Sequence, residues 1–212
     1  NTITGVRYCD DKAVLCWETG NEVESPVSWT REIAHYLKSL DTNHLVMDGY
    51  AINVRAEVLN LPDVDIVTTH HYPGGGKSFA ERIRENAALA KGKKAYIVGE
   101  FGFASTAVME AAVKAIEDSS ASGGLVWSLR FRDRDGGFYW HSESAGGSTM
   151  KAYHWPGSTM GQAYDEIHFM NFVRSNAFAI RGLPVPEIPV PAPPKLLPIA
   201  DPAAISWQGS VG

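Results

Sequence analysis

The sequence lacks several features that would each assign a protein to a class at once. Only two of its 212 residues are cysteine. Cys9 and Cys16 do not have the CxxC spacing of a metal or redox site, and we expect a loop thiol at Cys9 and a buried strand residue at Cys16. No apolar run reaches the roughly 18 residues needed to cross a bilayer, so we expect no membrane partner.

Positive charge is also scarce. The chain has 19 lysines and arginines against 24 aspartates and glutamates, which leaves a net charge of −5. Because a nucleic-acid binder normally carries a basic stripe, we expect no nucleic-acid partner. No signal-peptide pattern follows Asn1, so any targeting segment is expected upstream of it.

Short apolar runs alternate with helical patterns, which predicts βαβ units and a parallel sheet. Ser25 and Pro26 are expected to cap and begin the first long helix, which continues to Leu40. Strands are expected at 13–17, 44–47, 65–72, 95–103 and 124–131, and the other helices at 54–59, 78–90, 106–119 and 159–180. Five strands indicate either an open doubly wound sheet or part of a (β/α)8 TIM barrel, which typically needs about 40 more residues.

The composition changes after Gly182. Residues 183–202 contain eight prolines, so we expect a stiff linker or a strap along the domain formed by residues 1–182. Residues 203–212 are expected either to begin a β-sandwich module or to form a tail.

Two glutamates carry the strongest chemical signal. Glu22 and Glu100 each lie just beyond an apolar strand, where α/β proteins place their active sites. Glycoside hydrolysis needs two carboxyl groups beside one bond, one to protonate the leaving oxygen and one to attack or to direct water. Position alone leaves open the alternative that each glutamate is simply solvated.

Four local motifs extend this signal. The residues WETGNE at 17–22 resemble the W-E-x-x-N-E signature of clan A glycoside hydrolases, especially the cellulase and mannanase family 5. The residues VGEFG at 98–102 resemble that family's nucleophile strand. His70-His71-Tyr72 matches its H-x-Y motif, and Trp127 matches the tryptophan that floors its sugar site. The motifs occur in the family's order, and the resemblance covers about residues 1–182.

This resemblance implies a fold and a set of roles. The chain would supply about strands 4–8 of a (β/α)8 barrel. Glu22 would be the general acid/base and Glu100 the nucleophile of a retaining, double-displacement mechanism. Asn21 would bind the sugar 2-hydroxyl, Tyr72 would donate a hydrogen bond to Glu100, and His70 would orient the carboxylates.

Aromatic residues would complete the substrate groove. Trp127, Trp140 and Trp155 are expected to stack on flat sugar faces, with ordinary loop packing as the alternative for the last two. Glu18 is expected to point away from Glu22 and to support the site only indirectly. His71 is expected to be packed or exposed because it alternates away from His70.

The sequence also departs from the family pattern. Val23 stands where proline usually follows the acid/base glutamate, which concerns the shape of the loop. The first three barrel strands, with an arginine that the family places on the second, have no counterpart in this chain. We therefore expect a partner segment that supplies the N-terminal part of the barrel.

Other readings of the same residues compete with this one. Residues 72–78 (YPGGGKS) suggest a Walker A loop, but that motif needs glycine where His71 stands. His70, His71, His141 and His154 suggest a metal hydrolase, although adjacent strand residues point to opposite faces. A third alternative is a non-catalytic carbohydrate-binding barrel.

We therefore predict a retaining endo-acting β-glycosidase with a poly- or oligosaccharide substrate. β-1,4-Mannan is the favoured polymer and β-glucan the next. We expect no metal and no organic cofactor. The resemblance to secreted polysaccharide-degrading enzymes, together with the proline-rich segment, predicts an extracellular protein.

Overall fold

A computed structural model describes most of the chain. The described residues are 2–130, 141–145, 148–155, 157, 164–188, 190, 193–199, 201, 203 and 207–208. They form two compact units. The first comprises Asn1–His71, Gly75–Phe101 and Ala111–Val126, and the second comprises Tyr72–Gly74, Gly102–Glu110 and Trp127–Gly212.

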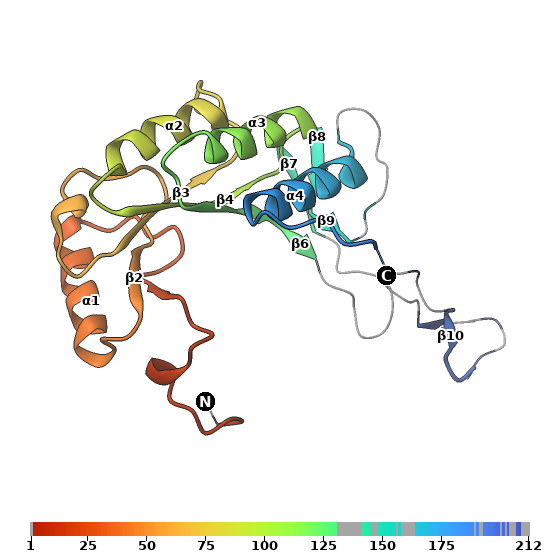
Figure 1. Ribbon diagram of the computed structural model, residues 1–212, viewed down its shortest axis with the longest axis horizontal. Helices are drawn as coiled ribbons and strands as arrows, with labels where there is room; N and C mark the ends of the chain where they lie inside the picture. Colours follow the sequence, from red (N-terminus) through yellow and green to blue (C-terminus); the bar gives the residue numbers. More distant parts are fainter. Residues whose placement is uncertain are drawn as a thin grey trace. The chain divides into compact units, whose positions relative to one another are not determined.

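The first unit is built on a sheet whose strands follow one another in chain order. These strands are β1 (Cys16–Glu18), β2 (Leu45–Asp48), β3 (Ile66–His71), β4 (Ala95–Gly102) and β5 (Gly123–Trp127), hydrogen-bonded in that order (Figure 1). The pairs β1–β2, β2–β3 and β3–β4 are parallel. A doubly wound sheet would reverse its strand order at a switch point, so the consecutive order favours a segment of a barrel.

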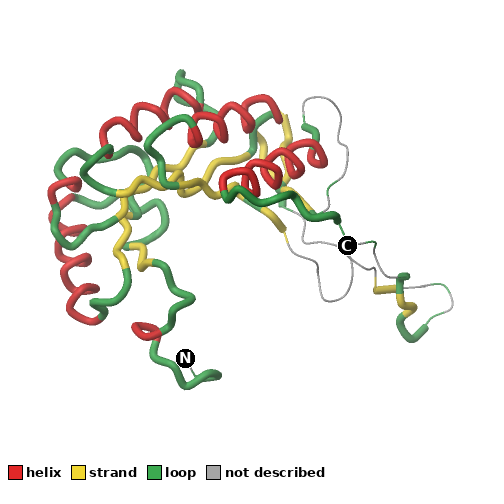
Figure 2. Tube along the Cα trace, viewed as in Figure 1, coloured by secondary structure: helices red, strands yellow, loops and turns green. Residues whose placement is uncertain are grey.

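Helices connect these strands. They are α1 (Val27–Leu40), α2 (Phe79–Ala90) and α3 (Thr106–Glu117), and Figure 2 shows α1 and α2 beside the sheet of the first unit. Alternate strand residues face the helices, because side chains alternate between the two faces of a strand. Between the sheet and the helices lies a core of fully buried small and branched residues, among them Ala34, Val46, Val67, Ile83, Val98 and Ala112.

Some boundaries in the first unit differ from the sequence-based expectation. The first strand begins at Cys16 rather than at residue 13. Pro26 precedes α1 instead of opening its first turn, and Ser25 does not cap the helix because its Oγ lies 3.3 Å from Thr30 Oγ1. The helix expected at 54–59 is the 3-10 turn η2 (Val58–Asn60).

The second unit contains short strands and one long helix. β6 (Leu129–Arg130) pairs with β9 (Tyr153–His154), β7 (Ser142–Ala145) with β8 (Ser148–Lys151), and β10 (Lys195–Leu196) with β11 (Trp207–Gln208). The single strand expected at 124–131 is therefore wrong, because β5 ends at Trp127 and β6 joins a different sheet. The last helix, α4 (Glu166–Ile180), begins later than expected, with Asp165 as its N-cap.

The core of the second unit is aromatic. Tyr153 stacks on Tyr164 with 5.2 Å between ring centroids and lies 4.9 Å from Phe169 of α4. The fully buried carboxylate of Glu166 accepts a 2.6 Å hydrogen bond from the His154 amide. Burying a charge without such a partner would be costly, so this bond fixes the start of α4 against β9.

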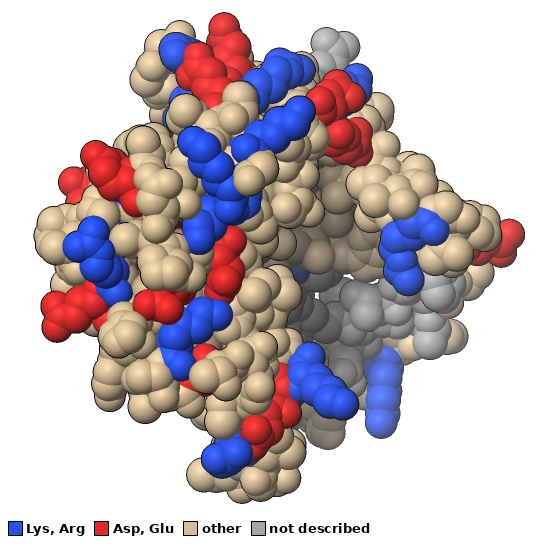
Figure 3. All heavy atoms as spheres, turned by 60° about the vertical axis from the view of Figure 1, so that its left-hand side comes forward, with Lys and Arg blue, Asp and Glu red and all other residues tan. Residues whose placement is uncertain are grey.

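The surface carries charges of both signs. On the face shown in Figure 3, lysine and arginine side chains are interspersed with aspartate and glutamate. Cys9, in the 3-10 turn η1 (Tyr8–Asp10), and Cys16 are both free thiols, and Cys16 is half-buried rather than buried. Within the described residues, no helix has the length and apolar character needed to span a bilayer.

Candidate active site

Glu22 lies in a short loop directly after β1. Its backbone has φ 54°, a left-handed conformation that is uncommon for residues other than glycine. The Glu22 side chain is 51% exposed. The loop therefore presents this carboxylate to solvent at the C-terminal end of the sheet, where barrel active sites lie.

The loop is held by the backbone that follows β2. Thr19 Oγ1 accepts a 3.0 Å hydrogen bond from the Gly49 amide, and the Val23 amide donates to the Gly49 carbonyl at 3.0 Å. A Cβ atom at Gly49 would lie 1.6 Å from the Gly20 carbonyl oxygen. Only glycine allows the two backbones to approach this closely, so Gly49 sets the position of the loop that carries Glu22.

Glu100 and His70 come from the two neighbouring strands β4 and β3. They are register partners, and the pairing shifts between Thr69 and His70. The His70 amide donates a 2.6 Å hydrogen bond to the Ala51 carbonyl. A Cβ atom at Gly99 would lie 2.8 Å from His70 Nε2, so this glycine leaves room for the imidazole ring.

These three side chains converge. His70 Nδ1 lies 2.8 Å from Glu22 Oε1 and 3.7 Å from Glu100 Oε1. One oxygen of each carboxylate and one ring nitrogen of His70 all lie within 4.8 Å of one another. The His70 side chain is 6% exposed and that of Glu100 is 14% exposed, so the carboxylate of Glu100 is the more enclosed of the two.

A third carboxyl group adds to the charge of this site. Glu18 is at the end of β1, and partial burial raises its pKa. The nearby charges of Glu100 and Asp48 raise it further, whereas His70 lowers it. The expectation that Glu18 points away from Glu22 and supports the site only indirectly stays a prediction.

The other residues predicted for the site have contacts of their own. Asn21 is exposed beside Glu22. Tyr72 stacks on Phe103 at 5.9 Å, Trp127 packs edge-on against His141 at 6.3 Å, and these contacts belong to the second unit.

Two tryptophans remain. Trp155, also in the second unit, is half-buried, with the Arg174 guanidinium 5.8 Å from its ring. Trp140 lies outside the described residues. The roles assigned to Tyr72, Trp127, Trp140 and Trp155 stay predictions.

His71 is packed on the opposite side of β3. It is 1% exposed, and its Nε2 lies 2.8 Å from Thr69 Oγ1, which is also bonded to Tyr96. Burial lowers the pKa of His71 to about 3, assisted by the charges of Arg82 and His70. His71 is therefore a neutral core residue near pH 7.

Both side chains that would hold phosphate in a Walker A loop have protein partners. Lys77 Nζ lies 2.6 and 2.8 Å from the two oxygens of Glu85. Ser78 caps α2 by accepting from the Glu81 amide, while Glu81 accepts from the Ser78 amide. This capping box accounts for the serine without a nucleotide.

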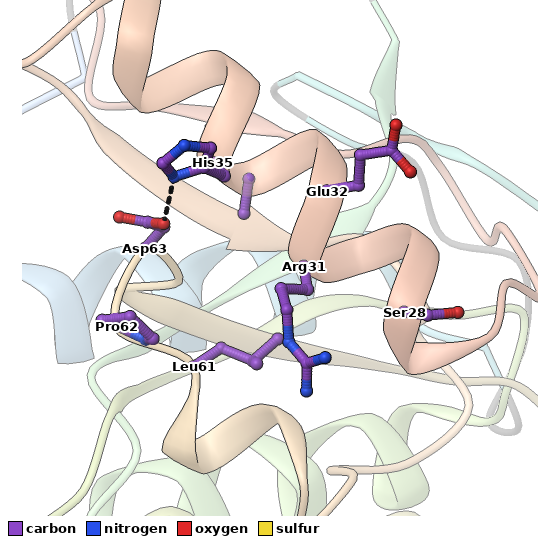
Figure 4. Close-up of a pocket in the computed structure, with 8 residues that line it drawn as sticks. Ser28, Arg31, Glu32, His35, Leu61, Pro62 and Asp63 are labelled. Carbon is purple, nitrogen blue, oxygen red and sulfur yellow. Dashed lines mark hydrogen bonds and ion pairs between the residues drawn. The ribbon is translucent and has the colours of Figure 1, made fainter.

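A cavity of about 340 Å³ lies outside the carboxylate site. It is lined by α1 and by the segment that leads into β3, and an ion pair of 3.0 Å joins His35 and Asp63 at its edge (Figure 4). Asp63 precedes β3, whereas Glu22 and Glu100 lie at or beyond strand ends. The cavity is therefore separate from the carboxylate site.

Several residues that shape the site were not singled out from the sequence. Gly49 had a detectable signal, because a glycine directly after a strand often marks close backbone approach. Ala51, with a φ of 65°, had none, since alanine does not favour the left-handed region.

The chain is similar to known proteins. Residues 1–95 match the family model described as GH family 5 beta-mannosidase-like. A protein of Oryza sativa subsp. japonica with the provisional name mannan endo-1,4-beta-mannosidase 9 is 30% identical over 61% of this chain and 44% of its own length. Mannan endo-1,4-beta-mannosidase 1 of Arabidopsis thaliana is 34% identical over 34% of this chain and 25% of its own length.

Solved structures give the same picture. The endo-1,4-beta-mannanase from Rhizomucor miehei is 27% identical, with a TM-score of 0.53 over 61% of this chain and 48% of that one. A family 5 mannosidase from the same organism, solved with mannosyl-fructose, superposes with a TM-score of 0.62 at 16% identity over 86% of this chain and 55% of its own.

The chain thus spans about half the length of the relatives it matches. Its sheet and helices are those of part of a (β/α)8 barrel, as the motifs predicted. The resemblance to glycoside hydrolase family 5 is confirmed, and over residues 1–95 the chain is similar to the β-mannosidase-like members of that family.

Proposed function

We propose that the protein is a retaining glycoside hydrolase. The observation that carries this proposal is the closeness of the Glu22 and Glu100 carboxylates. One oxygen of each lies within 4.8 Å of one oxygen of the other. Retaining enzymes hold their carboxyl groups about 5–5.5 Å apart, whereas inverting enzymes need roughly 6.5–9.5 Å to admit a water molecule. The spacing favours direct attack by one carboxylate on the sugar.

The two glutamates have different surroundings, which suit different roles. The Glu100 carboxylate attacks the anomeric carbon and forms a glycosyl ester, while Glu22 gives its proton to the departing oxygen. Glu22 then removes a proton from water, and the water oxygen displaces Glu100. The greater exposure of Glu22, at 51% against 14%, gives it access to the leaving group and to water.

The hydrogen bond from His70 links the two steps. Its Nδ1 faces both carboxylates, at 2.8 Å from Glu22 and 3.7 Å from Glu100. A donor between two acids lowers the cost of holding a negative charge on either one, and this charge changes place during the reaction. We further propose that Asn21, Tyr72, Trp127, Trp140 and Trp155 contact substrate, as the family resemblance implies.

β-1,4-Mannan is the proposed polymer and β-glucan the second choice. The support is that its relatives are named as mannan endo-1,4-beta-mannosidases. We also propose that a further segment completes the barrel, since the chain covers only 44% and 48% of the lengths of two relatives. An extracellular location remains a proposal that rests on the resemblance to secreted polysaccharide-degrading enzymes.

Hydrolysis of mannan and β-glucan oligosaccharides by the intact protein tests this function. Proton NMR of the first product should show the β anomer, followed by slow mutarotation. Glu22→Gln and Glu100→Gln should each reduce kcat at least 10³-fold, and Glu24→Gln, a nearby exposed control, should not. An α-anomeric first product would refute retention, and sugar binding without any hydrolysis would support a carbohydrate-binding barrel.

A further inference from the structure

Arg55 and Asp48 form a buried ion pair in the first unit. Arg55 Nη2 lies 2.7 and 3.0 Å from the two carboxylate oxygens of Asp48, which is the last residue of β2. The two side chains are only 9% and 5% exposed. The guanidinium also lies over the Tyr50 ring, with 4.2 Å between Cζ and the ring centroid. Because a buried charge without a partner is costly, each member of the pair needs the other.

The same guanidinium binds the segment that follows Glu22. Its Nη1 donates a 2.7 Å hydrogen bond to the Ser25 carbonyl, three residues after Glu22. Its Nη2 donates a 2.8 Å hydrogen bond to Thr30 Oγ1 on α1. A guanidinium is planar and its donors point in fixed directions. Contacts from both Nη atoms of Arg55 therefore fix the Ser25 carbonyl relative to Asp48.

The loop that carries Glu22 thus has two attachments to the segment after β2. Thr19 Oγ1 and the Val23 amide are bonded to the backbone of Gly49. The second attachment is the hydrogen bond from Arg55, on the C-terminal side of Val23. Glu22 has a φ of 54°, and such a conformation persists only where surrounding contacts impose it. The two attachments supply such contacts close to Glu22.

We propose that Arg55 is a positioning residue for Glu22 that acts through the backbone of this loop. By holding the Ser25 carbonyl against Asp48, it fixes the direction from which Glu22 approaches the leaving oxygen and, later, water. This role rests on the proposed hydrolase function, in which Glu22 is the acid/base. Glu100 lies within β4 and is held by the register with β3, so loss of the Arg55 contact should spare the nucleophile.

Arg55→Lys is the variant that tests this role. It keeps a positive charge beside Asp48, so the buried carboxylate retains a cationic partner. An ammonium presents its donors from a single point, and it cannot reach both Asp48 and the Ser25 carbonyl as two Nη atoms do. Arg84→Lys makes the same substitution at an exposed position of α2 and serves as the matched control.

Aryl β-mannobiosides with different leaving groups separate the acid from the nucleophile. Dinitrophenolate departs without a proton, whereas unsubstituted phenolate needs general acid catalysis by Glu22. In Arg55→Lys, kcat/KM for the phenyl mannobioside should fall roughly 10²-fold, as expected for a catalytic group displaced by about 1 Å. The kcat/KM for the dinitrophenyl mannobioside should stay close to that of the unmutated protein. Arg84→Lys should match the unmutated protein on both substrates.

Azide tests the second step of the reaction. Water needs Glu22 to remove its proton, whereas azide needs no base. Azide nitrogen attacks the anomeric carbon, the bond to Glu100 breaks with its electron pair returning to the carboxylate, and a β-mannobiosyl azide is released. Azide should therefore raise kcat of Arg55→Lys on the dinitrophenyl substrate and leave kcat of Arg84→Lys unchanged.

Amide hydrogen exchange tests the attachment of the loop without any sugar. The Val23 amide, which is bonded to the Gly49 carbonyl, should exchange faster in Arg55→Lys than in Arg84→Lys. If the unmutated protein cleaves neither mannobioside while the Val23 amide responds, the hydrolase function is contradicted and the attachment stands. Equal losses on the two leaving groups, a kcat that azide does not restore, or an unchanged Val23 amide would overturn the role of Arg55.

Discussion

Single residues fix the geometry of the site, and Gly49 offers a sharp test. A Cβ atom at this position would lie 1.6 Å from the Gly20 carbonyl oxygen, so Gly49→Ala must displace the loop that carries Glu22. A misplacement of about 1 Å can cost roughly 10²-fold in rate, and we expect a loss of that size in kcat/KM. Gly123→Ala, whose Cβ meets nothing within 4 Å, should retain activity. Equal activity of the two variants would show that the loop tolerates the shift.

The buried His71 side chain should make the free energy of unfolding depend on pH. Its pKa is lowered to about 3 in the folded protein by burial, against about 6.5 in the unfolded chain. The unfolded state therefore binds more protons below pH 6.5, and the stability contributed by His71 falls by up to about 1.4 kcal/mol per pH unit as the pH drops towards 3.

Replacing His71 should remove this dependence. In His71→Leu, urea unfolding between pH 6.5 and 4.5 should show a shallower loss of stability than in the unmutated protein. Thr69 keeps Tyr96 as a partner, with 2.5 Å between their oxygens, so no new unsatisfied hydroxyl is created. Parallel pH dependences of the two proteins would mean that His71 is not buried in its neutral form.

At this scale the sequence identified chemistry better than conformation. The motifs placed Glu22, Glu100 and His70 together, and the structure brings these three side chains within 4.8 Å. The left-handed φ of Glu22 reflects tertiary contacts of its loop, which local sequence does not encode.

At the scale of elements, the start of α2 is set by its capping box. Ser78 accepts from the Glu81 amide, and Glu81 accepts from the Ser78 amide. Ser78→Ala should lower the free energy of unfolding by about 1 kcal/mol, because the first turn loses a side-chain acceptor. Ser28→Ala, at an exposed position of α1, should have little effect or stabilise slightly. Urea denaturation of both variants checks this, and equal midpoints would contradict the cap.

Long periodic elements were predicted well from the sequence, and boundaries less so. Helices α2 and α3 lie within one or two residues of the expected ranges, since apolar spacing and the Ser78 signal mark them clearly. The apolar run at 124–131 was wrongly taken as one strand. A run of apolar residues does not encode the change of hydrogen-bonding partner at Ser128, which separates β5 from β6.

For the molecule as a whole, the exposed side chains of the sheet lead to a prediction about a partner segment. Cys16 lies on the face of β1 that points away from the helices, as does its register partner Leu45 on β2. Leu45 is 39% exposed, and Leu125 of β5 is 63% exposed. A partner segment that supplies the missing barrel strands would cover this face. We expect such a segment to slow the modification of Cys16 by a thiol reagent and to leave Cys9, in η1, unaffected. Equal rates for Cys16 with and without the segment would exclude this mode of completion.

The pattern of strands and helices predicted two alternative folds, a barrel and a doubly wound sheet. Alternating strands and helices are shared by barrels and doubly wound sheets, so the sequence pattern alone did not choose between them. The motif order favoured the barrel, and the consecutive strand order agrees with it.

The central claim is that Glu22 and Glu100 act across one sugar, with Glu100 as the nucleophile. The most direct measurement is to incubate the intact protein with an activated 2-fluoro mannoside and to locate the label by peptide mass spectrometry. The account predicts one covalent sugar on the peptide that contains Glu100, and none in Glu100→Gln. A label on Glu22, on Glu18 or on any other side chain would contradict it.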